Sequence, residues 1–244
     1  MPLLYNGFHM GVILEGQIRN YLKAYNAIKE NDVVCVGVSG GKDSMVLLHA
    51  LVSLREYISI PFEIKAVTIS LGFEGFDTGT ISSMCEGLGV RHEVVETDIG
   101  RIVFDARGGD NPCSLCSNMR RGALNNAASD LGCNKVALGH NKDDLIETYL
   151  LALFYEGRMH TFSPVTYLSR KALEVIRPLS FSYEKDVRYY RNTHGIPVIG
   201  NPCPADKVSK RKEIRELITK MSRENPHFKS NVFGAIKRNH IGGW

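Results

Sequence analysis

Apolar residues in the first two thirds of the chain form short continuous runs that alternate with stretches of helical spacing. The run Val33 to Val38 is rich in β-branched residues and has the length of a buried strand, and a helical pattern from Met45 to Leu54 follows it. Three more strand-like segments (63–70, 92–96, 135–138) are separated by helical patterns (80–88, 116–131). Because strands alternate with helices, we expect an α/β fold with a doubly wound parallel sheet.

The pattern beyond position 145 is mainly helical and is interrupted by prolines. Helical spacing is found at 145–155, 183–194 and 206–223, and an N-terminal stretch at 11–30 is predicted to pack on the core domain as a helix. We therefore expect three parts: an N-terminal helical segment (1–30), a central α/β domain (31–205) and a small, mainly helical, basic C-terminal extension (206–244).

The composition of the 244 residues, with 43% hydrophobic and 23% charged, is that of an ordinary globular protein. It excludes a disordered chain and a small disulfide scaffold. No apolar run approaches the ~18 residues of a membrane helix, and no export signal precedes the first strand, so we expect a cytoplasmic protein without membrane contact.

The net charge of +4 is unevenly distributed along the chain. Residues 1–110 carry −5, whereas residues 111–244 carry +9, and the segment 207–244 has 10 Lys and Arg against 3 Asp and Glu. A basic half indicates a polyanionic partner such as RNA, and an ordinary solvated surface is the alternative.

A glycine-rich loop joins the first strand to the next helix, and its sequence is Ser39-Gly40-Gly41-Lys42-Asp43-Ser44. Glycines let the backbone amides approach phosphate oxygens at a helix N-terminus, while the two serines and Lys42 add further donors. The loop is neither a Walker A motif nor G-x-G-x-x-G. A phosphate site is favoured over a simple tight turn.

A second polar segment, Gly139-His140-Asn141-Lys142-Asp143-Asp144, follows the strand at 135–138 and should lie at the same edge of the sheet. Its paired carboxylates, Asp143 and Asp144, could hold Mg²⁺ together with substrate phosphates. The alternative is a helix N-cap role for either aspartate. We interpret His140 as a packing or nucleotide-site residue rather than a metal ligand.

The six cysteines need another explanation than disulfides, which a reducing compartment disfavours. Cys113 and Cys116 form a C-x-x-C pair after Pro112 and before a helix, which suits half a zinc site, a redox pair or part of an iron–sulfur site. Cys203 stands between two prolines in a loop-like segment. Cys35 and Cys133 are predicted core residues, and Cys85 is unassigned.

The string S-G-G-x-D-S resembles the PP-loop of the adenine nucleotide α-hydrolase superfamily, which splits ATP into AMP and pyrophosphate. Four elements in order resemble the tRNA 2-thiocytidine synthetase family: this loop, C-x-x-C followed by Met119-Arg120-Arg121-Gly122, G-H-x-x-D-D, and Asn201-Pro202-Cys203. The resemblance implies that Lys42 and Asp43 serve adenylation and that Gly139, His140, Asp143 and Asp144 belong to the ATP site. It also implies that a [4Fe–4S] cluster is bound by Cys113, Cys116 and Cys203, whose three thiolates leave one iron open for sulfide.

These features predict an ATP-dependent tRNA thiolase that adenylates the C2 oxygen of a cytidine. The partners expected are tRNA and a sulfide donor, which is a cysteine desulfurase or free sulfide, with a homodimer left open. Two related families fit this chain poorly. The 2-thiouridine synthetases carry additional zinc-binding Cys/His sets, and the tRNA-lysidine synthetases have no cluster cysteines. Two alternatives stay open: the same chemistry on uridine or a small molecule, and a non-catalytic nucleotide-binding iron–sulfur or zinc sensor.

Overall fold

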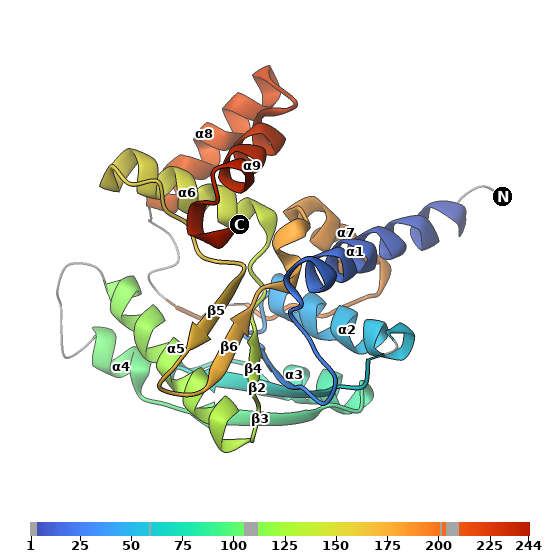
Figure 1. Cartoon of the computed structure of the whole chain (residues 1–244). Coiled ribbons are helices and arrows are strands. Elements are labelled where there is room, and N and C mark those ends of the chain that lie inside the picture. Colours follow the sequence, from blue (N-terminus) through green and yellow to red (C-terminus); the bar gives the residue numbers. More distant parts are fainter. Residues whose placement is uncertain (1–3, 59, 105–111, 201, 204–209) are drawn as a thin grey trace.

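The computed structural model describes residues 4–58, 60–104, 112–200, 202–203 and 210–244. Within these ranges six strands form one sheet in the order β3-β2-β1-β4-β6-β5 (Figure 1). Their bounds are β1 Val33–Gly37, β2 Glu63–Ser70, β3 Arg91–Glu96, β4 Lys135–Ala137, β5 Val165–Leu168 and β6 Leu173–Ile176. The strands are parallel except β5, which pairs antiparallel with β6. The predicted doubly wound α/β fold is therefore confirmed, with one antiparallel edge strand added.

Strand β1 lies at the point where the chain reverses its direction of winding. The chain continues from β1 to β2 and β3 on one side, and β4 then pairs with the other side of β1. In open α/β sheets ligands bind beyond the carboxyl ends of the strands at such a switch point. Both loops singled out in the sequence leave from these two strands, β1 and β4.

Helices connect the parallel strands and cover the sheet. They are α2 Lys42–Tyr57, α3 Thr78–Gly87, α4 Ile99–Phe104, α5 Pro112–Asp130 and α6 Lys142–Glu156. The main apolar cluster lies between β1, β2 and α2, whose Met45, Leu48 and Leu51 are fully buried. A second cluster on the opposite face packs Leu124 and Ala128 of α5 against Val136. The sheet is thus covered on both faces, as near-continuous apolar strands require.

The N-terminal helix α1 (Leu4–Tyr25) packs against this core. Leu14, Ile18 and Tyr21 are fully buried in the main cluster. The Tyr21 hydroxyl donates to Pro164 O at 2.7 Å and accepts from the Arg177 amide at 2.9 Å. These bonds tie α1 to the end of β6, where the 3-10 helix η1 (Pro178–Phe181) begins before α7 (Glu184–Thr193).

The C-terminal part consists of α8 (Lys210–Glu224), α9 (Phe228–Arg238) and the 3-10 helix η3 (Ile241–Gly243), and it lies over α6 (Figure 1). Ile214 and Ile218 of α8 pack on Ile146 and Leu150 of α6. The sequence analysis missed α9 and the β5–β6 hairpin, and the predicted start of α8 at 206 lies outside the described residues. None of the described helices combines the length and apolarity that a membrane crossing requires.

Candidate active site

The glycine-rich loop between β1 and α2 is held in shape by its own hydrogen bonds. The Ser44 hydroxyl donates to Gly41 O (2.9 Å) and accepts from the Ser39 amide (3.0 Å). Gly40 has a φ of +76°, and a Cβ there would lie 3.0 Å from the Cβ of Ile199, so glycine is required. The N-cap residue of α2 is Gly41, which offers no side chain to the first amides of the helix. Those amides remain available to an anion, as a phosphate site needs.

The second loop, after β4, lies directly against the first one. A Cβ on Gly139 would stand 2.9 Å from the Asp43 carbonyl carbon and the Ser44 nitrogen, so only glycine allows this approach. Asn141 donates from Nδ2 to Asp43 Oδ1 at 3.0 Å. Its Oδ1 also caps α6 by accepting from the amides of Asp143 and Asp144. The sequence analysis did not single out Asn141, although an asparagine directly before a helical pattern is an N-cap signal.

Lys42 is paired with two carboxylates at the edge of the loop. Its Nζ lies 2.8 Å from Asp43 Oδ2 and 2.9 Å from Glu184 Oε1. Burial lowers the pKa of Lys42, but the hydrogen bonds and charges of Asp43 and then Glu184 outweigh it and raise the pKa overall. The ammonium group is therefore charged and already positioned next to the α2 N-terminus. Glu184, the first residue of α7, was not predicted because it comes from a distant part of the sequence.

The adjacent aspartates of the second loop point to different partners. Asp143 is buried; its Oδ1 accepts from Lys229 Nζ of α9 at 2.5 Å and its Oδ2 from the Glu184 amide at 2.7 Å. Asp144 accepts from the Asn141 amide at 3.0 Å, which completes a capping box. Burial raises the pKa of Asp144 to about 6, and the nearby charges of Asp43 and Glu147 add to the shift. The N-cap of α6 is Asn141 and neither aspartate, so the predicted N-cap role is wrong. Asp144 supports the cap from the third helical position and lies beside the loop, whereas Asp143 joins three helices.

His140 lies next to the aromatic ring of Phe162, with ring centroids 5.0 Å apart. Burial lowers its pKa to about 3, and the positive charges of Arg177, Arg211, Arg121 and Arg120 act in the same direction. The imidazole is therefore neutral near pH 7. Its Nδ1 is buried and has no hydrogen-bond partner among the described residues. The arginines that affect it come from α5, from α8 and from the position directly after β6, which shows that basic residues converge on this edge of the sheet.

Cys113 and Cys116 lie in the first turns of α5, because the helix begins at Pro112, and not in a turn before the helix as expected. Proline at the first helical position explains the early start, since its missing N–H is not needed there. Cys113 is exposed and Cys116 is half-buried. Burial raises the pKa of Cys116; Arg120 lowers it, and Cys203 and then Cys113 raise it further. The three thiols thus share one electrostatic neighbourhood although Cys203 is 90 positions from Cys113.

Within the described ranges, no three Cys, His, Asp or Glu side chains lie close enough to hold a single metal ion. A four-iron cluster separates its ligands farther than a single ion does, and the three thiols supply the soft donors it requires. Asn201, the first residue of the predicted N-P-C motif, lies outside the described residues. The cysteine set is therefore compatible with a cluster but is not arranged for a mononuclear metal.

The other three cysteines are core residues. Cys35 in β1 and Cys133 before β4 are buried, as predicted, in the cluster on the α5 face. Cys85, which the sequence left unassigned, is fully buried in α3. Burial raises its pKa to about 11, so its thiol is neutral and protected. Cys85 serves packing.

Comparison with known proteins agrees with this arrangement. The model of the PP-loop domain family matches residues 13–222. A solved structure, the U34-tRNA thiolase NcsA from Methanococcus maripaludis with its [4Fe–4S] cluster, superposes with a TM-score of 0.74 at 24% identity and covers 93% of this chain and 79% of that one. Fold and loop together define a PP-loop protein that binds ATP.

Two similar proteins identify the family within the class of PP-loop proteins. The tRNA-cytidine(32) 2-sulfurtransferase of Syntrophotalea carbinolica is 37% identical over 87% of this chain and 83% of its own length. The protein of the same name from Shewanella halifaxensis is 36% identical over 92% of this chain and 73% of its own. The chain belongs to the family of the tRNA-cytidine(32) 2-sulfurtransferases.

Proposed function

We propose that this protein is an ATP-dependent tRNA sulfurtransferase that replaces the C2 oxygen of a cytidine by sulfur, at position 32 as in its relatives. The observation that carries the proposal is the meeting of the PP-loop and the G-H-x-x-D-D loop at one edge of the sheet, with Arg120 of the cysteine helix and Arg211 of α8 affecting the same His140. Adenylation and sulfur transfer need such neighbouring sites, because the activated nucleotide must meet the sulfur before water does.

The PP-loop residues Ser39, Gly40, Gly41, Lys42, Asp43 and Ser44 bind the phosphates of ATP. The uncapped amides of α2 and the charged Lys42 lower the energy of the negative charge that develops on pyrophosphate as it leaves. To reach the phosphates, Lys42 exchanges its bond to Glu184 for one to a phosphate oxygen. Gly139 and His140 supply a close backbone approach and a neutral, buried surface beside this loop.

Asp144, together with Asp43, is the best candidate to hold Mg²⁺ on the phosphates. Carboxylate oxygens are ligands that Mg²⁺ prefers, and the two groups are near enough for the charge of Asp43 to raise the pKa of Asp144. A divalent cation would offset their mutual repulsion. Asp143 acts differently, since both its oxygens are occupied by Lys229 and the Glu184 amide. It positions α7, and with it Glu184, beside Lys42.

Cys113, Cys116 and Cys203 would hold a [4Fe–4S] cluster through three thiolates. When bound, such a cluster offers an iron without a protein ligand, to which exogenous sulfide can bind. Burial raises the pKa of Cys116, and the charge of Arg120 partly offsets this shift in the direction of the thiolate that ligation requires.

The reaction then has two balanced steps. The C2 oxygen of the base attacks the α-phosphorus of ATP, an O–P bond forms, and pyrophosphate leaves with the electrons of the broken P–O bond. Sulfide attacks C2; the C2–O bond breaks and AMP leaves with that oxygen. The sulfide is present free in solution, or a thiol reductant releases it from the persulfide of a cysteine desulfurase and is itself oxidised to a disulfide. The target base must be unstacked to reach the site, which is easiest in a tRNA loop.

Nucleoside mass spectrometry of tRNA from cells with and without this protein tests the proposal. We expect 2-thiocytidine to disappear when the gene is removed and to return with the wild-type gene. AMP formation should depend on added tRNA, whereas a nucleotide-binding sensor would show no such turnover. An unchanged nucleoside profile, or loss of a thiouridine instead, would contradict the assignment to cytidine.

A further inference from the structure

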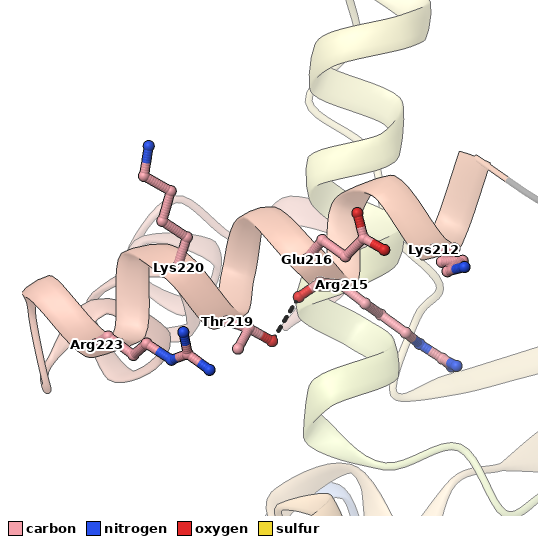
Figure 2. Close-up of a pocket in the computed structure, with 6 residues that line it drawn as sticks. All are labelled: Lys212, Arg215, Glu216, Thr219, Lys220 and Arg223. Carbon is pink, nitrogen blue, oxygen red and sulfur yellow. Dashed lines mark hydrogen bonds between the residues drawn. The ribbon is translucent and has the colours of Figure 1, made fainter.

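The outward face of α8 carries basic residues along most of its length. Lys212, Arg215, Lys220 and Arg223, here called the α8 basic strip, line a shallow hollow of about 430 Å³ together with Glu216 and Thr219 (Figure 2). The opposite face of the helix is apolar and packs Ile214 and Ile218 on α6. Packing on α6 therefore fixes the orientation of the strip, and the cations are displayed by a helix that is anchored in the fold.

Most charges of the strip are not neutralised within the protein. Lys212, Lys220 and Arg223 are exposed and form no ion pair with any described residue. Arg215 is the exception, since its Nε bonds Glu147 Oε1 of α6 at 2.8 Å. Glu216 is the one acidic residue among those that line the hollow. The strip is a positive surface that lacks its counter-charge.

The strip continues a positive region that begins at the active site. Arg211, on the first turn of α8, lowers the pKa of His140 and that of Asp144. Arg120 and Arg121 of α5 act on the same His140 from another side. Helix α6 links the active site to the strip, because Asp144 lies in its first turn and α8 packs against its later turns. A polyanion that enters the site can thus extend along α8.

The spacing of the strip suits a chain of phosphates. Residues 212 to 223 span about 16 Å of helix at 1.5 Å per residue. Successive phosphates of one strand advance about 3.4 Å along the axis of B-DNA. The advance in an RNA duplex is no longer than this, so several phosphates can lie along this length. A membrane surface would need apolar side chains on the same face, and the residues that line the hollow are all polar or charged.

We infer that the α8 basic strip binds the sugar-phosphate backbone of the tRNA next to the target nucleotide and so directs that nucleotide to the site where the loops after β1 and β4 meet. The inference rests on the proposed function, since tRNA is the ligand. Backbone contacts of this kind fix position without reading sequence. Arg215 links the strip to Glu147 and hence to the helix that carries Asp144.

The test compares two triple variants with the same change of charge. In the first, Lys212, Lys220 and Arg223 are replaced by glutamate; in the control, the exposed Arg19, Lys23 and Lys171 are replaced. Arg215 is left intact because its loss would leave Glu147 buried without a counter-charge. Binding of unmodified tRNA to cluster-loaded protein is measured at several salt concentrations, and ATP binding and circular dichroism report on the fold.

We expect the strip variant to bind tRNA at least about tenfold more weakly, with the slope of log K against log salt less steep by about 2 to 3. The control should keep its slope, and both variants should bind ATP as the wild type does. Glu216→Gln should tighten tRNA binding about two- to threefold, because it removes the one negative charge of the hollow.

Equal affinity and slope in the strip variant and the control would overturn the inference. If the strip variant lost its fold, the single Glu216→Gln variant would decide, and unchanged or weaker tRNA binding there would overturn it. The proposed function is tested separately. If the strip variant formed 2-thiocytidine at the wild-type rate, the proposed function would stand and the inferred role of the strip would be wrong. If the wild-type protein bound no tRNA, both the proposed function and the role of the strip would be wrong.

Discussion

The phosphate loop and the cysteine site differ in how the protein arranges their functional groups before a ligand binds. In the loop several side chains are already bonded: Ser44 closes the turn, Asn141 holds Asp43, and Lys42 is paired with two carboxylates. The cysteine site has an exposed Cys113, a half-buried Cys116 and a half-buried Cys203 that approach from two distant segments.

The difference follows from the ligands. A nucleotide comes and goes in each turnover, so its site gains from being formed in advance. A cluster stays bound, and its metal–thiolate bonds can supply the energy that orders their ligands. Substitutions in the two regions should therefore have different effects. Those in the cysteine site should abolish cluster binding and leave ATP binding unchanged, and those in the loop should weaken ATP binding and leave the cluster in place.

The largest expected effect comes from the cysteine site. Cys116→Ser should abolish cluster binding and thiolation, since two thiolates do not retain a cluster designed for three. The measurements are iron and labile sulfide in anaerobically purified protein and 2-thiocytidine in tRNA. ATP affinity should stay within about twofold. Cys85→Ala is the matched control, because this thiol lies in the apolar core, and it should keep the cluster with a loss of about 1 kcal/mol in stability. Zinc without iron in the wild type would contradict the assignment.

A change in the loop should have the opposite signature. Gly139→Ala places a methyl group 2.9 Å from the backbone of Asp43 and Ser44, so the two loops must separate. We expect ATP to bind at least about tenfold more weakly by calorimetry, with a normal iron content. Gly122→Ala is the control, since nothing lies within 4 Å of its Cβ, and it should stabilise α5 by about 0.5–1 kcal/mol. Equal ATP affinity in both variants would show that the close approach is not needed.

A moderate, pH-dependent effect is expected at Asp144. Its pKa in the folded protein is about 6, above that of the unfolded chain, so its ionisation above pH 6 destabilises the fold and protonation between about pH 6 and 4 relieves this cost. Without ATP and Mg²⁺, Asp144→Asn should therefore be more stable than wild type at pH 7.5 by about 1–2 kcal/mol and nearly equal at pH 4.5. Urea unfolding at the two pH values measures this, and an advantage that persists at pH 4.5 would point to another cause.

The smallest effect concerns the pairing of Lys42. Glu184→Gln removes a carboxylate that competes with phosphate for this ammonium, and the pair is partly exposed, with 28% and 40% of the two side chains accessible. We expect ATP to bind about two- to fivefold more tightly. Glu174→Gln in β6 is the control, because it also removes one negative charge. Weaker ATP binding in Glu184→Gln would instead show that Glu184 positions Lys42 for the phosphates.

Several parts of the site could be predicted from local sequence because their signals are local. The strand before Ser39 and the glycines of the loop act within a few positions, through backbone freedom. Asn141, the cap of α6, carries an equally local signal, which the sequence analysis overlooked. The run of βαβ units fixes which loops leave the same edge of a sheet, so the meeting of Asp43 with the second loop could be anticipated. The hairpin β5–β6 could not, because each strand has four residues and depends on its partners.

The sequence by itself determined the chemistry that this protein can perform: the phosphate loop, the three candidate ligand cysteines and a basic C-terminal region. Tertiary structure alone decided how these groups are used. It brought Glu184 to Lys42, turned Asp143 toward Lys229 and away from the loop, and laid α8 on α6 so that its cations face outward. These choices depend on contacts between residues far apart in the chain, whose energies come from burial and charge pairing and leave no local pattern in the sequence.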